Sequence, residues 1–235
     1  MMQDGLNIEK LLGQVNKDKY HKATIGEVKH IPQVKLEHLS PKQALDDYIL
    51  INHEVIRSNL ELCYKIVKKS QSWSDPTKPS VPFPRELVNA FDALLAGSEF
   101  PSERVEYYTA VKPHTIEAHN KSEEMNLNRT HLDAIGIDAF FEIVVDEDEE
   151  NGKKKIVRIP FDLTLRDKFD EKKANKDKNI FIMIISDDLD YDMAQAGTLK
   201  SMTKEDCIKK HVNPQAEKLL KIFEQASKSN KFDII

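Results

Sequence analysis

The sequence predicts an α/β or α+β protein, in which a helical N-terminal half precedes a small mixed β-sheet with flanking helices. Three observations support this fold class. Apolar residues recur at helical spacing in the first half of the chain and again near its C-terminal end. Residues 136–164 contain two runs of alternating apolar and polar residues around an acidic turn with a glycine, which is typical of a β-hairpin. Residues 180–185 are apolar without alternation, as in a strand that is covered on both faces.

The composition sets limits on size and compartment. The 235 residues suit one domain with an extension or two small domains, and 40% apolar residues are enough for a core. A net charge of −5 argues against a general nucleic-acid coat, although it leaves room for an enzyme with a local basic track. Two distant cysteines, Cys63 and Cys207, indicate neither a disulfide framework nor a zinc site. No secretory signal and no membrane-spanning run is evident, so we expect a soluble cytoplasmic protein without membrane contact.

The N-terminal region is interpreted as an arm, residues 1–39. It packs on the main body or on a protein partner, and a mobile terminus is the alternative. A short amphipathic helix is expected here, because Ile8, Leu11, Leu12 and Val15 have helical spacing.

Residues 40–83 are expected to form a helix followed by a Pro-rich linker. Ser40 suits the N-cap and Pro41 the first helical position, and an apolar stripe extends to about Ser70. Beyond it, the density of prolines favours extended backbone, which marks a domain boundary. Trp73, the only tryptophan, either anchors this linker on the body or stacks on a ligand, and anchoring is the favoured interpretation.

Residues 84–235 are expected to form an α/β domain that ends in C-terminal helices. Caps, prolines and apolar stripes mark its helices. A lysine-rich connector, a short exposed helix or loop, joins the hairpin to the apolar strand. The expected helices are 84–96, a short one at 102–108, one beginning after Pro113, one from Thr203 to Lys210 and one opened by Pro214.

The hairpin gathers polar residues on one face of the sheet. Side chains alternate between the two faces of a strand, so the apolar set faces a core. Asp138, Glu142, Asp162 and Thr164 then share the opposite face. A turn near Glu150 places Asp138 opposite Asp162, because the turn and the buried face fix the register. The apolar set is Ala139, Phe141, Ile143, Val157, Ile159, Phe161, Leu163 and Leu165.

Two opposed carboxylates suggest a metal site. They repel each other and raise each other's pKa values, and a divalent cation between them relieves this repulsion. Mg²⁺ takes oxygen ligands and needs only one or two protein carboxylates. The alternative is that Asp138 and Asp162 are solvated residues on the exposed face of the hairpin. Arg158 is assigned to that same exposed face, so its replacement is expected to be tolerated.

These residues resemble the core of the PD-(D/E)XK nuclease superfamily. The similar features are a helix, an Asp that opens a strand (Asp138), a hairpin partner with a second acid (Asp162), and the apolar strand at 179–186. The resemblance covers about residues 113–190. It implies a restriction-endonuclease-like core within a nuclease-like domain at 84–235. The implied function is hydrolysis of phosphodiester bonds in DNA or RNA, with Mg²⁺ or Mn²⁺ as the cofactor.

The resemblance also implies roles for individual residues. Asp138 and Asp162 hold the metal ion, and an acid from the preceding helix assists. Glu124 is the candidate for this acid, with Glu123 nearly as suitable. Two histidines are further candidate ligands, since some members of the superfamily use a His; they are His119 and His131.

The expected catalytic lysine has a different position in this chain. The family pattern has Lys two residues after the second acid, where this sequence has Thr164. Viral cap-snatching endonucleases are similar in this respect and take the Lys from the following helix. Lys168 is then the candidate, with Lys172 and Lys173 also available. If Thr164 instead marks a degraded site, the alternative is a catalytically inactive binding or assembly module of a phage or mobile element.

Overall fold

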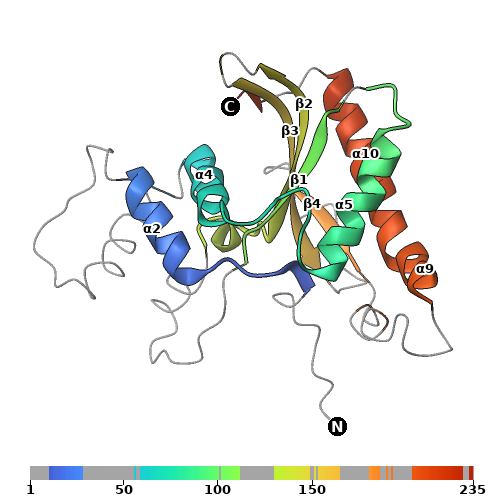
Figure 1. Cartoon of the computed structure of the whole chain (residues 1–235), viewed down its shortest axis with the longest axis horizontal. Helices are drawn as coiled ribbons and strands as arrows, with labels where there is room; N and C mark the ends of the chain where they lie inside the picture. Colours follow the sequence, from blue (N-terminus) through green and yellow to red (C-terminus); the bar gives the residue numbers. More distant parts are fainter. Residues whose placement is uncertain are drawn as a thin grey trace, which may run out of the picture.

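The computed structural model of the chain describes residues 11–28, 56, 59–100, 102–111, 130–148, 151, 153–164, 180–185, 189, 192, 203–229 and 233–234. In this part of the chain, a mixed β-sheet lies between helices on both of its sides (Figure 1). The mixed α/β fold class predicted from the sequence is therefore confirmed. None of the described helices has both the length and the apolar character needed to cross a bilayer.

The sheet has the order β1 (Arg104–Thr109), β2 (Ala139–Asp148), β3 (Lys153–Thr164) and β4 (Phe181–Ile184). β2 is antiparallel to both neighbours, whereas β4 runs parallel to β3. The two-residue β5 (Asp233–Ile234) pairs with the start of β3. A parallel pair requires a crossover connection, and the chain between β3 and β4 lies almost wholly outside the described residues.

β1 corrects the short helix that was expected at 102–108. Val105 and Tyr107 belong to the core on one face of the sheet, and Tyr108 belongs to the core on the other. Glu106, between Val105 and Tyr107, is buried as well. A strand buried on both faces shows no alternation of apolar and polar residues, so its period of two is hidden in the sequence.

The described helices begin where the sequence supplies capping groups. Asn59 accepts a hydrogen bond from the Leu62 amide at 3.1 Å, and Thr203 and Asp206 form a reciprocal capping box, as the sequence predicted for Thr203. Prolines occupy the first turns of the helices that begin at 82 and 213. The helical elements are α2 (Lys17–Val28), α4 (Leu60–Ser70), α5 (Pro82–Leu95), a 3-10 turn (Asp133–Ile135), α9 (Lys204–Cys207), a π-helical turn (Ile208–Val212) and α10 (Asn213–Lys228).

Each face of the sheet has its own core. α5 and α10 cover one face, where Phe141 of β2 contacts Phe91 of α5 with ring centroids 5.9 Å apart. α4 covers the opposite face, where Tyr64 meets Phe140 edge-on at 4.7 Å. Phe140 and Phe141 are consecutive residues of one strand and therefore point to opposite faces. Both faces of β2 are thus buried at its centre.

The hairpin has the register that its sequence predicted. Ala139 lies opposite Phe161, and the pairing continues to Val144 before a bulge shifts it by one residue. Beyond the bulge, three acidic positions of β2 lie opposite three lysine positions of β3 in the backbone register. These pairs are Asp146 with Lys155, Glu147 with Lys154 and Asp148 with Lys153.

The N-terminal segment packs on the main body but differs locally from the expectation. Leu11, Leu12 and Val15 are buried, and the Val15 amide donates to the Val111 carbonyl at 2.8 Å. The expected helix is interrupted at Gly13, which has a φ of 83°. A helix that the sequence analysis did not predict, α2, follows instead.

Several expectations lie outside the described residues. They concern the start of the helix at Ser40, the helix after Pro113 and the lysine-rich connector after β3.

Candidate functional site

Asp138 and Asp162 meet at one end of the β2–β3 hairpin. The Asp138 amide donates to the Phe161 carbonyl at 3.0 Å, and the Leu163 amide donates to Oδ2 of Asp138 at 2.9 Å. The carboxyl groups of Asp138 and Asp162 are joined by a hydrogen bond. Both side chains are half-buried. The hairpin therefore brings together the two acids that its register placed opposite each other.

The pKa values of both carboxyl groups are raised. Burial raises the pKa of Asp138 to about 7, against the pull of the Leu163 amide, and the nearby carboxyls of Asp162 and Asp133 add to the effect. Burial also raises the pKa of Asp162, while its hydrogen bond with Asp138 acts in the opposite direction. The two carboxyls therefore titrate as a coupled pair. Near neutral pH, one proton lies between the two carboxyls for part of the time.

The carboxyl pair fits a hard divalent cation. Either a shared proton or a shared cation reduces the repulsion between carboxylate oxygens that burial has brought together. Within the described part of the chain, no group of three or more His, Cys, Asp or Glu side chains is arranged to hold a metal ion. Asp138 and Asp162 supply two carboxylates, and Mg²⁺ usually needs only one or two from protein.

The other residues that the resemblance singled out are not part of this pair. His131 is buried, and its Nδ1 lies 2.5 Å from the hydroxyl of Tyr20, as in a packed structural histidine. Thr164 follows Asp162 on the same face of β3, and its carbonyl accepts a hydrogen bond from the Ile185 amide at 3.1 Å. The remaining candidates lie outside the described residues; they are His119, Glu123, Glu124, Lys168, Lys172 and Lys173.

A buried ion cluster lies further along the same face of the hairpin. Glu142 is fully buried and forms ion pairs with Lys68 of α4 and, at 2.9 Å, with Arg158 of β3. Arg158 also contacts Glu61 at 2.6 Å and lies over the ring of Tyr64 at 4.1 Å. The expectation that Glu142 and Arg158 face solvent is therefore wrong, because α4 covers this part of the sheet.

A cavity of about 510 Å³ opens beside this cluster. Each of its basic side chains already has a carboxylate partner. Lys65 and Lys69 both pair with Glu27 of α2, and Arg158 bridges Glu142 and Glu61. These contacts join α2 to α4 and α4 to the sheet. The lining consists of Asn59, Glu61, Leu62, Lys65, Lys68, Lys69 and Arg158.

Another buried acid, Asp192, contacts the C-terminal helical segment. Asp192 accepts from Nζ of Lys210 at 2.8 Å and lies 2.7 Å from Nε2 of His211. These contacts hold Asp192 against the π-helical turn that contains Lys210 and His211.

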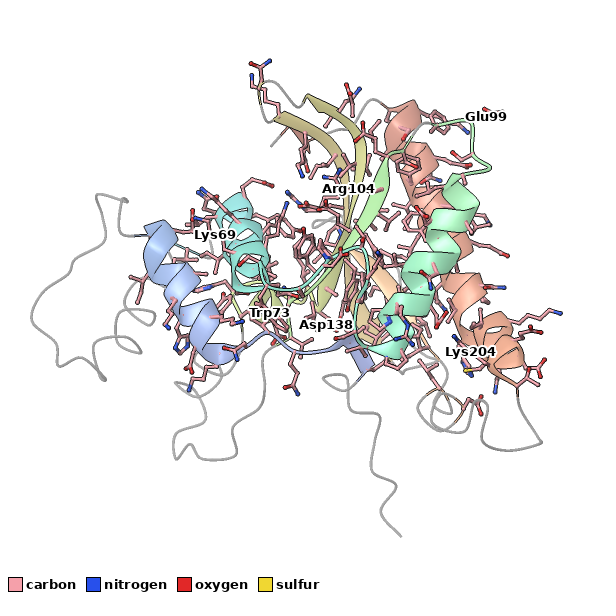
Figure 2. The ribbon with its side chains drawn as sticks, in the orientation of Figure 1. Lys69, Trp73, Glu99, Arg104, Asp138 and Lys204 are labelled. Carbon is pink, nitrogen blue, oxygen red and sulfur yellow. The ribbon has the colours of Figure 1, made fainter. Side chains whose placement is uncertain are left out.

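Trp73, for which anchoring of the linker on the body was the favoured interpretation, is exposed. Its side chain is 61% exposed, and its indole Nε1–H donates to the Ser70 carbonyl at 3.2 Å. The ammonium of Lys19 from α2 lies 4.3 Å from the ring centroid. Figure 2 shows Trp73 and Asp138 toward the same end of the sheet. The contacts of Trp73 therefore orient its ring without covering it.

Comparisons of the chain with protein-family models, with curated proteins and with solved structures returned no match.

Proposed function

We propose that the protein is a metal-dependent nuclease that hydrolyses phosphodiester bonds in DNA or RNA. The observation that carries this proposal is the pair of half-buried, hydrogen-bonded carboxyls of Asp138 and Asp162 at one end of a β-hairpin. Such pairs are destabilising unless a proton or a cation lies between them, so a chain that keeps one has a use for it.

The arrangement of the strands supports a restriction-endonuclease-like core. The hairpin β2–β3 has one acid at the start of its first strand and one near the end of its second strand, and the apolar strand β4 follows beside β3. These are the features on which the resemblance to the PD-(D/E)XK superfamily rests. Asp162 lies opposite Ile182 of β4, so the acids are supported by strands on both sides.

The residues have distinct roles in the proposed reaction. Asp138 and Asp162 would hold Mg²⁺ or Mn²⁺ in their ionised forms. The metal ion, when bound, supplies an acidic water molecule and neutralises charge on the phosphate. The Leu163 amide fixes the orientation of the Asp138 carboxyl throughout. Lys168 takes the role of the missing motif lysine and stabilises negative charge that develops on the phosphate. Glu124 completes the ligand set directly or through water.

A cleavage assay tests the proposal. Wild-type protein is incubated with single- and double-stranded DNA and RNA in Mg²⁺, in Mn²⁺ and in EDTA. Cleavage is expected with a divalent cation and should be lost in Asp162→Asn. Asp92→Asn is the matched control, because Asp92 is an exposed acid of α5, which covers the other face of the sheet. If no substrate is cleaved under any condition, the enzyme proposal is wrong.

A second candidate is a binding or assembly module with an inactive nuclease-like fold. Thr164 favours it, since the motif lysine is absent from the strand that positions Asp162. Binding of nucleic acid without cleavage by the wild-type protein would support this candidate.

A further inference from the structure

We propose that Trp73 stacks on an unpaired base of a single-stranded nucleic acid whose backbone passes the Asp138–Asp162 pair. This inference rests on the proposed nuclease function and names its substrate class. The indole of Trp73 is exposed, and a base provides a flat π-face of matching size on which an exposed aromatic ring can stack.

The ring of Trp73 is held in place before any ligand binds. Its N–H is hydrogen-bonded to the Ser70 carbonyl at the end of α4, and Lys19 lies over the ring. The loop that follows is braced by a turn in which Oδ1 of Asp75 accepts from both the amide and the hydroxyl of Thr77, at 2.9 and 2.7 Å. An aromatic side chain that is already ordered loses little conformational entropy when a base stacks on it.

A short chain of hydrogen bonds connects the Trp73 loop to the carboxyl pair. The side-chain amide of Gln71 donates to the Thr109 carbonyl at 2.9 Å, and its oxygen accepts from the Thr109 amide at 3.3 Å. Thr109 lies opposite Ala139, and the Ala110 amide donates to the Asp138 carbonyl at 2.7 Å. Neighbouring strands are about 4.8 Å apart. Thr109, which the Gln71 side chain contacts, is therefore about one strand spacing from the strand that Asp138 opens.

The charges near the ring favour a polyanion over an apolar peptide. Lys19 and Lys22 on α2 are exposed, and so is Lys78 in the Trp73 loop. The ammonium of Lys19 lies over the indole and is therefore within reach of a phosphate that flanks a stacked base. A duplex hides the faces of its bases, so only an unpaired base has a free face for Trp73.

Intrinsic fluorescence tests this inference directly, because Trp73 is the only tryptophan in the chain. Wild-type protein in EDTA is titrated with a single-stranded DNA oligonucleotide of mixed sequence and, separately, with the blunt duplex of that sequence. EDTA prevents cleavage during the measurement. The single strand should quench the emission in a saturable way, and the duplex should leave it nearly unchanged.

Variants separate stacking from structural effects. With a dye-labelled oligonucleotide, anisotropy should show affinity reduced by a factor of about ten in Trp73→Ala, while Trp73→Phe keeps most of it. Lys19→Ala should weaken binding at low salt. Leu60→Ala is the matched control, because Leu60 is the other exposed large apolar residue among those described and lies at the opposite end of α4.

The outcomes separate this inference from the proposed function. If Asp162→Asn retains the quenching but loses cleavage, both proposals stand. Cleavage by the wild type without quenching overturns the stacking inference and leaves the nuclease proposal intact. Quenching without any cleavage supports stacking in the binding module and overturns the nuclease proposal. Equal affinity of wild type and Trp73→Ala for the single strand also overturns stacking, whatever the activity. Equal quenching by single strand and duplex overturns the substrate class.

Discussion

The backbone amide of Leu163 donates a 2.9 Å hydrogen bond to Oδ2 of Asp138, across the end of the β2–β3 hairpin. This bond holds the Asp138 carboxyl beside Asp162 and leaves Oδ1 of Asp138 for a shared proton or cation. The amide favours the ionised form of Asp138, whereas burial favours the neutral form. The effect of burial is the larger, so the pKa of Asp138 is raised. The stability of the protein should therefore depend on the state of this pair.

Asp138→Asn should stabilise the metal-free protein at alkaline pH relative to wild type. Burial raises the pKa of Asp138 from 3.8 to about 7. Because the folded-state pKa exceeds the unfolded-state value, the stabilising contribution of this carboxyl is complete below about pH 4 and is lost as the pH rises through about 7. Asn cannot ionise, so the Tm difference between variant and wild type, measured in EDTA, should grow from about pH 5 to pH 8. A difference that does not change with pH would show that Asp138 titrates normally.

Mn²⁺ should bind the folded protein and raise its Tm, and it should bind more tightly at pH 8 than at pH 6. The ion replaces the proton held between Asp138 and Asp162, so binding releases a proton. Titration calorimetry in two buffers with different ionisation enthalpies measures that release. Asp162→Asn should abolish the Tm shift, whereas Asp92→Asn should retain it. Equal Mn²⁺ binding by wild type and Asp162→Asn would contradict the assignment of this metal site.

Arg158→Ala should destabilise the protein by about 3 kcal/mol or more, because it leaves the buried Glu142 with one fewer cationic partner. Lys65→Ala is the control. It removes a cation that is 62% exposed and should change the free energy of unfolding by about 1 kcal/mol at most. Urea unfolding curves measure both. Similar small effects for the two variants would mean that Glu142 does not depend on Arg158.

Tyr20→Phe should destabilise the protein by about 1–3 kcal/mol. The Tyr20 hydroxyl accepts from the His131 amide at 2.9 Å and contacts the His131 ring at 2.5 Å, and both residues are buried. Tyr107→Phe loses a single hydrogen bond, to the Leu12 carbonyl, and should cost less. Thermal melts of the two variants provide the comparison. A larger effect at Tyr107 would show that the Tyr20–His131 contact is not the stronger attachment.

Lys168→Ala should reduce nucleic-acid cleavage by a factor of about 10² while leaving Mn²⁺ affinity nearly unchanged, because an ammonium group stabilises charge but is not a metal ligand. Lys172→Ala and Lys173→Ala are the controls, and initial rates of cleavage are the measurement. If activity survives the loss of all three lysines, the role assigned to this segment is wrong.

The sequence alone determined the hairpin and the opposition of its two acids. Alternation fixes which residues of Ala139 to Ile143 and of Val157 to Leu163 share a face, and the short acidic turn fixes which residues are opposite. The N-cap at Thr203 and the apolar strand at 181–184 were likewise predictable, because both depend on local patterns. These features require information only from residues that are close in sequence or joined by one turn.

Only the tertiary structure decided what covers each face. The polar face of the hairpin was expected to be exposed throughout, but α4 packs on it and buries Glu142 and Arg158. The same register that pairs Asp138 with Asp162 also pairs Glu142 with Arg158, yet the pattern cannot show that a helix some seventy residues earlier supplies Lys68 to them. β1 was missed for the same reason. Period and propensity specify how a segment is shaped, whereas burial depends on which distant segment packs against it.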